Sequence, residues 1–104
     1  MEKRKAHYPL ARIKTLIQDG EYRVTSTALR CAANDFGFFD AAQVAEFILG
    51  LDDSDFFKSM TTIFDSALWQ DVYRPNVDGT PAYVKVQIVD VTTVVISFKS
   101  LEDE

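Results

Sequence analysis

Four basic side chains are the first candidates for chemistry in this chain of 104 residues. They are Lys58, Arg74, Lys85 and Lys99. Residues 31–104 hold these four Lys and Arg against thirteen Asp and Glu, whereas residues 1–30 hold seven against three. Cations that gather on one surface of an otherwise acidic protein would attract a phosphate group. The chemistry therefore depends on whether the fold brings them together.

A hairpin predicted near the C-terminus gathers two of these lysines. Residues 82–89 and 93–99 alternate apolar and polar side chains, which is typical of strands buried on one face. With Asp90-Val91-Thr92 as a three-residue loop, the apolar layer pairs Val84 with Phe98 and Val86 with Ile96. The same register sets Tyr83 opposite Lys99 and near Lys85 on the open face of the strands.

A second predicted hairpin extends this patch. A turn at Phe64-Asp65-Ser66 places Lys58 and Gln70 on a common face, with Arg74 on the same side of its strand as Gln70. Together the two hairpins predict a cationic, hydrogen-bonding surface that suits a phosphate. Its expected members are Lys58, Gln70, Arg74, Tyr83, Lys85 and Lys99.

Such a surface could cut RNA without a metal ion. The reaction needs a base for the 2′-hydroxyl, a cation beside the phosphorane and an acid for the leaving 5′-oxygen. Lysines, Arg74 and Tyr83 would have to do this work, because His7 is the only histidine. Gln70 does not titrate, but its amide could orient the phosphate or read a base edge. The pattern alone leaves an ordinary alternative open, since lysines that alternate on an exposed strand are commonly a solvated face.

The remaining pattern predicts the elements that must position these residues. Helices are expected at 9–18, at 27–34 after an N-cap at Thr25-Ser26, and at 41–49 after a capping box at Asp40. Strands are expected at 22–24, 56–63, 68–74, 82–89 and 93–99. Helices followed by strands predict an α+β fold, with the helices packed on one face of an antiparallel sheet formed mainly by the C-terminal half.

Composition limits the other function classes. Apolar residues make up 47% of the chain, so we expect one folded domain over residues 1–104. A single cysteine, Cys31, and a single histidine exclude an internal disulfide and a Cys/His zinc cluster, and we expect neither a metal nor a cofactor. Charges interrupt every apolar run, so no membrane span is expected and the cytoplasm is the expected location. We expect most phenylalanines to be core residues rather than a base-stacking platform, namely Phe36, Phe38, Phe39, Phe47, Phe56, Phe57 and Phe64.

Two segments carry a family resemblance. Residues 54–62 (SDFFKSMTT) and 69–75 (WQDVYRP), in this order and spacing, resemble the motility quorum-sensing regulator (MqsR) toxins. The likeness extends to the N-terminal Met1–Arg4, to Tyr83 with Lys85 and to Ser97–Lys99. It implies a RelE-like fold, and it places the family's functional positions on Lys58, Gln70, Tyr83 and Lys99, with Met60 and Arg74 as nearby candidates. We expect Lys85, Arg74 and Met60 to contact the RNA.

The resemblance also implies an activity and a partner. It implies a ribosome-independent mRNA interferase that needs no metal, cleaves mRNA at short GC-containing triplets such as GCU and so inhibits translation. It further implies an MqsA-like antitoxin with a zinc-binding region and a helix-turn-helix DNA-binding region. The alternative is a catalytically silent member that only binds the antitoxin and modulates its DNA binding. The acidic end, Leu101–Glu104, would weaken RNA binding if it folded back onto the phosphate site.

Overall fold

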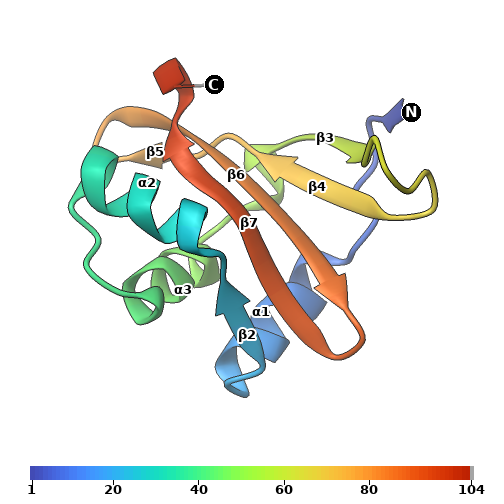
Figure 1. Cartoon of the computed structure of the whole chain (residues 1–104), viewed down its shortest axis with the longest axis horizontal. Helices are drawn as coiled ribbons and strands as arrows, with labels where there is room; N and C mark the ends of the chain where they lie inside the picture. The colour runs from blue at the N-terminus through green and yellow to red at the C-terminus, as the bar shows by residue number, and fades with distance from the viewer. Residues whose placement is uncertain (104) are drawn as a thin grey trace.

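The three helices lie together on one side of the molecule, and the β3–β4 hairpin projects away from them (Figure 1). The computed structural model describes residues 1–103. The helices are α1 (Leu10–Gln18), α2 (Ser26–Phe36) and α3 (Ala41–Leu49), with short 3₁₀ turns η1 (Asp53–Asp55) and η2 (Leu101–Asp103). The strands are β1 (Glu2–Lys3), β2 (Tyr22–Val24), β3 (Phe56–Thr61), β4 (Trp69–Tyr73), β5 (Asn76–Val77), β6 (Thr80–Val89) and β7 (Thr92–Ser100). The predicted α+β class is confirmed.

Local capping explains where the helices begin. The Thr25 side chain accepts a hydrogen bond from the Ala28 amide, so α2 begins one residue earlier than predicted. The Asp40 side chain accepts from the Gln43 amide at 2.9 Å and caps α3. In a standard capping box the Gln43 side chain would accept from the backbone amide of the N-cap residue, Asp40. Here Gln43 Oε1 accepts instead from the backbone amide of Phe39, one residue earlier.

The sheet is mixed rather than purely antiparallel. Its order is β1-β3-β4-β6-β7-β2, and β5 pairs with β6 outside this path. Every pairing is antiparallel except β2 with β7, which is parallel. α1 connects β1, at one edge of the sheet, to β2, at the opposite edge. The antiparallel sheet predicted for the C-terminal half is confirmed, and the parallel pairing is confined to the edge where β2 joins it.

The N-terminal strand β1 was not predicted. It pairs Glu2 with Met60 and Lys3 with Ser59 at the outer edge of β3. A buried carboxylate anchors the segment that follows: Asp71 accepts from the amides of His7 at 3.1 Å and Tyr8 at 2.9 Å. Burial, reinforced by the Asp71 charge, raises the pKa of the neighbouring Tyr8 phenol. The first eight residues are therefore bonded to the sheet.

The β6–β7 hairpin confirms half of the predicted register. Tyr83 pairs with Lys99 and Val84 with Phe98. The predicted pair Val86–Ile96 is wrong, because Val86 faces Val95 across a β-bulge that leaves Ile96 unpaired. The predicted three-residue loop is also wrong: Val89 pairs with Thr92, so Asp90 (φ 56°) and Val91 form a two-residue turn. The turn has one residue fewer than predicted, and the bulge adds one residue to β7. The two changes cancel, so the pairs beyond the bulge, such as Tyr83 with Lys99, are those predicted.

The core lies between the helices and one face of the sheet. It joins Ile13 and Ile48 from the helices to Val84 and Phe98 from the strands. The rings of Phe36, Phe38 and Phe47 surround Phe98 at centroid distances of 5.5–5.7 Å for each contact. Phe39 and Phe64 were wrongly expected in the core, since they are 84% and 99% exposed.

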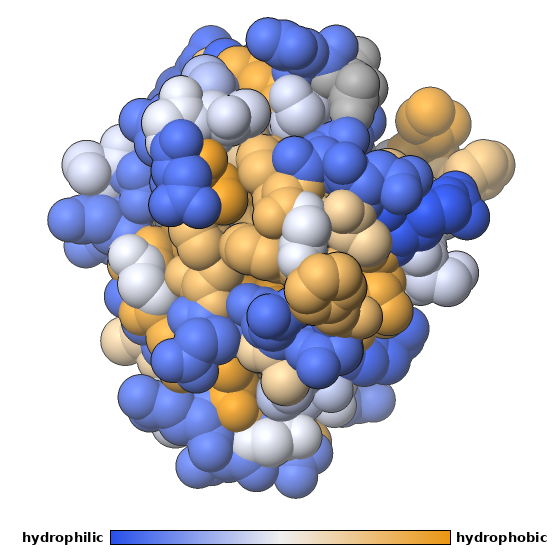
Figure 2. All heavy atoms as spheres, turned by 90° about the vertical axis from the view of Figure 1, so that its left-hand side faces the viewer, coloured by the Kyte–Doolittle hydropathy of each residue, from blue (hydrophilic) through white to orange (hydrophobic). Residues whose placement is uncertain are grey.

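The face toward the loop between α2 and α3 carries apolar surface surrounded by hydrophilic residues (Figure 2). A shallow pocket of about 460 Å³ lies there between Phe38, Phe47 and neighbouring residues of α3.

Among the described residues, no helix has the length and the apolar character that crossing a membrane requires. The acidic end that was predicted to weaken RNA binding, Leu101–Glu104, includes Glu104, which lies outside the described residues.

Candidate active site

The predicted site residues lie on the sheet face that points away from the core, here called the open face. Its centre is Val72 on β4, whose Cα partners are Lys58 on β3 and Lys85 on β6. Tyr73, the residue after Val72, and Val84, the residue before Lys85, point to the core instead. Two strand spacings, about 10 Å, separate the two lysine backbones. Their long side chains therefore flank a shorter valine, and the predicted common face for these lysines is confirmed.

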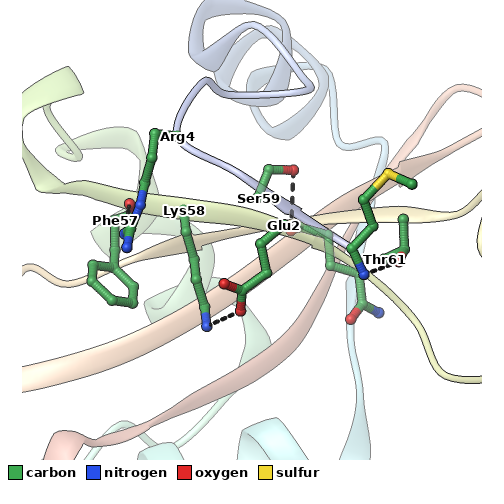
Figure 3. A network of polar contacts seen from close by, with 8 residues as sticks. Glu2, Arg4, Phe57, Lys58, Ser59 and Thr61 are labelled. Atoms are coloured by element: carbon green, nitrogen blue, oxygen red, sulfur yellow. Dashed lines mark hydrogen bonds and ion pairs between the residues drawn. The ribbon is translucent and has the colours of Figure 1, made fainter.

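Lys58 forms an ion pair at the outer edge of the open face. Its Nζ lies 2.5 Å from Glu2 Oε1, and Figure 3 shows the two side chains pointing toward each other from adjacent strands. The Lys58 side chain is 21% exposed and that of Glu2 is 54% exposed. The hydrogen bond and the charge of Lys58 lower the pKa of the Glu2 carboxyl below its ordinary 4.5. The N-terminal strand therefore adds a carboxylate to the predicted cationic site.

Three cations surround the ring of Phe57. The Arg74 guanidinium carbon lies 3.6 Å from the ring centroid, that of Arg4 at 5.2 Å, and Lys58 Nζ at 5.5 Å. Arg4 also donates to the Phe57 carbonyl at 3.4 Å, from the segment after β1. Cations over an aromatic face are attracted by the ring quadrupole, so Phe57 holds this group together. The expectation that Phe57 belongs to the core was wrong.

The hairpin side of the open face is built around Tyr83. Lys99 Nζ lies 5.4 Å and Lys85 Nζ 5.8 Å from the Tyr83 ring centroid. Tyr83 is 7% exposed, so little of the residue besides what faces the two ammonium groups is open to solvent. The predicted neighbourhood of Tyr83, Lys85 and Lys99 is therefore confirmed.

Gln70 lies deeper than expected. It is 9% exposed, and its Nε2 donates to Gln87 Oε1 at 3.1 Å. Gln87 is itself buried, and Met60 on β3 is the Cα partner of Gln70. A row of Met60, Gln70 and Gln87 thus borders the row of Lys58, Val72 and Lys85. An amide held by another amide has a fixed orientation, which suits the positioning of a substrate better than a flexible surface group would.

Sequence reasoning missed Glu2, Arg4, Phe57 and Gln87 as parts of the site. Glu2 lies on β1, which is too short to give a periodic signal, and Arg4 follows that strand. Phe57 lies on a predicted strand, but its role arises from cations of separate segments that meet at its ring. Gln87 could have been found, because the alternation of residues 82–89 already places it on the same face as Tyr83 and Lys85. Among the described residues, no cluster of three or more His, Cys, Asp or Glu could hold a metal ion.

The arrangement combines the groups that act on a phosphodiester. At one end of the open face, the Arg74 guanidinium and the Lys58 ammonium group lie near Phe57, and the Glu2 carboxylate pairs with Lys58. At the other end, the Tyr83 phenol lies between the ammonium groups of Lys85 and Lys99. Such cations stabilise charge that develops on phosphate oxygens. Positioned phenol and amine groups can transfer protons to or from ribose oxygens.

Comparisons with known proteins agree with this chemistry. The family model described as "Motility quorum-sensing regulator, toxin of MqsA" matches residues 5–100. A protein of Escherichia coli (strain K12) named mRNA interferase toxin MqsR is 40% identical over 99 residues. The aligned region covers 95% of this chain and 98% of that relative.

Proposed function

This chain belongs to the motility quorum-sensing regulator toxin family, and on that premise we propose that it is an mRNA interferase that acts through the open face. The whole chain, residues 1–104, would work as a single toxin domain in the cytoplasm. The observation that carries the proposal is the convergence of Lys58, Tyr83 and Lys99 on one face of an acidic protein. An RNA phosphate is the substrate group that such a face attracts.

The proposed reaction needs no metal ion and no ribosome. The ribose 2′-oxygen forms a bond to phosphorus while the bond from phosphorus to the 5′-oxygen breaks, which leaves a 2′,3′-cyclic phosphate and a 5′-hydroxyl. A base on the open face takes the 2′-proton, and an acid returns a proton to the 5′-oxygen. Lys58 and Lys99 serve as base or cation, Tyr83 donates a hydrogen bond or proton, and Gln70 orients the RNA. Lys85, Arg74 and Met60 contact the RNA around this centre.

The same family membership supports a partner. We propose that an MqsA-like antitoxin, with a zinc-binding region and a helix-turn-helix region, restrains the toxin. Cleavage is proposed at short GC-containing triplets such as GCU, so that uncontrolled toxin would stop translation. Zinc and DNA would then be bound by the partner rather than by this chain.

One experiment tests the activity. Purified protein is incubated in EDTA with an RNA that contains GCU, beside the variants Lys58→Ala and Tyr83→Ala, and the fragment ends are mapped. We expect cleavage at a GC-containing triplet, and a loss of about 100-fold or more in each variant. Absence of cleavage by folded wild-type protein would instead favour the alternative, a silent member that acts only on the antitoxin.

A further inference from the structure

We propose that Glu2 is a positioning residue that holds Lys58 as an ammonium ion, so that Lys58 neutralises the phosphorane and does not take the 2′-proton. This inference rests on the proposed ribonuclease function. It assigns a role to one of the two site lysines, which the sequence leaves interchangeable. It also brings the N-terminal strand into the reaction, although that strand contains none of the predicted site residues.

The strand pairing fixes the position of Glu2. Glu2 faces Met60, which lies two residues beyond Lys58 on the same face of β3. The carboxylate therefore reaches Lys58 diagonally across one strand spacing, where long side chains make contact. Met1 holds β1 on the N-terminal side of Glu2: its carbonyl accepts from the Thr61 amide at 3.0 Å, and its N-terminal amine donates to Thr61 Oγ1 at 3.2 Å. On the other side of Glu2, Lys3 pairs with Ser59.

The chemistry of the ion pair separates the two possible roles of Lys58. A general base needs a free electron pair on nitrogen, and an ammonium group that donates to a carboxylate has none. Stabilisation of the phosphorane needs a positive charge, which the ammonium group supplies throughout the reaction. Because Lys58 itself lowers the pKa of Glu2, the carboxylate stays ionised at neutral pH. Lys58 therefore neither gains nor loses a proton while the P–O2′ bond forms and the P–O5′ bond breaks.

The first arm of the test replaces Lys58. Arginine keeps a permanent charge and does not act as a base, whereas alanine removes both properties. In EDTA with the GCU RNA, we expect Lys58→Arg to retain kcat within about tenfold of wild type and Lys58→Ala to lose about 100-fold or more. A Lys58→Arg variant as inactive as Lys58→Ala, with an unchanged melting temperature, would overturn the assignment.

The second arm tests Glu2 by single-turnover kinetics in two backgrounds. We expect Glu2→Gln to lower kcat two- to fivefold, about the effect of losing an exposed ion pair, with no increase in KM. Glu2→Asp should recover part of the loss, and the exposed Glu46→Gln should change nothing. In the Lys58→Ala background Glu2→Gln should have no further effect, because its target is gone.

The outcomes separate the inference from the proposed function. An equal loss from Glu2→Gln in both backgrounds, or no loss in either, would overturn the positioning role while RNA cleavage by the wild type still stood. A wild-type protein that cleaves no RNA would instead remove the proposed function itself.

Discussion

The two halves of the open face are assembled in different ways. Tyr83, Lys85 and Lys99 lie on the β6–β7 hairpin, whose strands are joined by a two-residue turn. The other half takes Lys58 from β3 and Glu2 from β1, which are 56 residues apart in sequence. Local pairing thus positions the hairpin half, whereas contact between the N-terminal segment and the distant β3–β4 hairpin positions the Lys58 half.

The two halves also differ in the charged groups that they contain. The described contacts of the hairpin half set two ammonium groups beside a phenol, whereas the Lys58 half adds a carboxylate to its cations. Like charges close together raise the affinity for a polyanion, while a paired carboxylate holds one cation in place. We therefore expect both halves to be sensitive to single catalytic substitutions, and the Lys58 half to be sensitive also to loss of the N-terminal anchor.

The largest effect is expected from Tyr83→Phe in the hairpin half. It removes only the hydroxyl that would donate to the RNA, and it leaves the ring between its two lysines. We expect kcat of the folded variant to fall about 100-fold, whatever the change in melting temperature. Single-turnover cleavage and thermal unfolding measure the two quantities, and Tyr22→Phe on β2 is the matched control. Wild-type kcat in Tyr83→Phe would contradict a role for the hydroxyl.

The next effect concerns the anchor of the Lys58 half. Asp71→Ala leaves the part-buried hydrogen bonds of the His7 and Tyr8 backbone amides without their acceptor, and we expect the free energy of unfolding to fall by about 2 kcal/mol. Cleavage by the folded variant should also slow, because β1 no longer holds Glu2 beside Lys58. Urea titration measures the first change, with the exposed Glu21→Ala as control. An unchanged midpoint would show that Asp71 does not anchor the segment.

A smaller effect compares phosphate contacts in the two halves. Lys85→Ala and Arg74→Ala should each weaken binding of an uncleavable single-stranded RNA several-fold. Each should also reduce the slope of log affinity against log salt concentration by about 0.7, the value for one lost contact. Fluorescence anisotropy across a salt series measures both. Lys5→Ala, an exposed cation outside the open face, serves as control, and a slope unchanged from wild type would exclude that residue as a phosphate contact.

The smallest expected effect is the pH dependence of the Glu2 ion pair. The folded-state pKa of Glu2 lies below its unfolded value, so its contribution to stability is present above about pH 4.5 and is lost as pH falls through the folded pKa. The stability difference between wild type and Glu2→Gln should therefore be constant near neutral pH and disappear in acid. Unfolding at a series of pH values tests this, and a difference that persists at the acid end would contradict it.

The sequence predicted the elements with strong periodicity and missed those that depend on distant contacts. The bounds of α3 and β2 were predicted correctly, because capping and flanking turns fix them locally. The pairing of Tyr83 with Lys99 was also correct. The bulge at Ile96 escaped prediction, because Val94 and Val95 are both apolar and hide the change of face. β1 escaped because two charged residues show no period, and its partner strand lies more than fifty residues away.

Two RNAs that differ by one oxygen atom test whether the open face cleaves RNA through the ribose 2′-hydroxyl. One carries a ribose and the other a 2′-deoxyribose on the 5′ side of the cleaved bond, and both are incubated with the wild-type protein in EDTA. We expect cleavage of the first RNA alone, with a 2′,3′-cyclic phosphate on the upstream fragment. Cleavage of the deoxy-substituted RNA at the same bond, or a requirement for added metal ion, would contradict it.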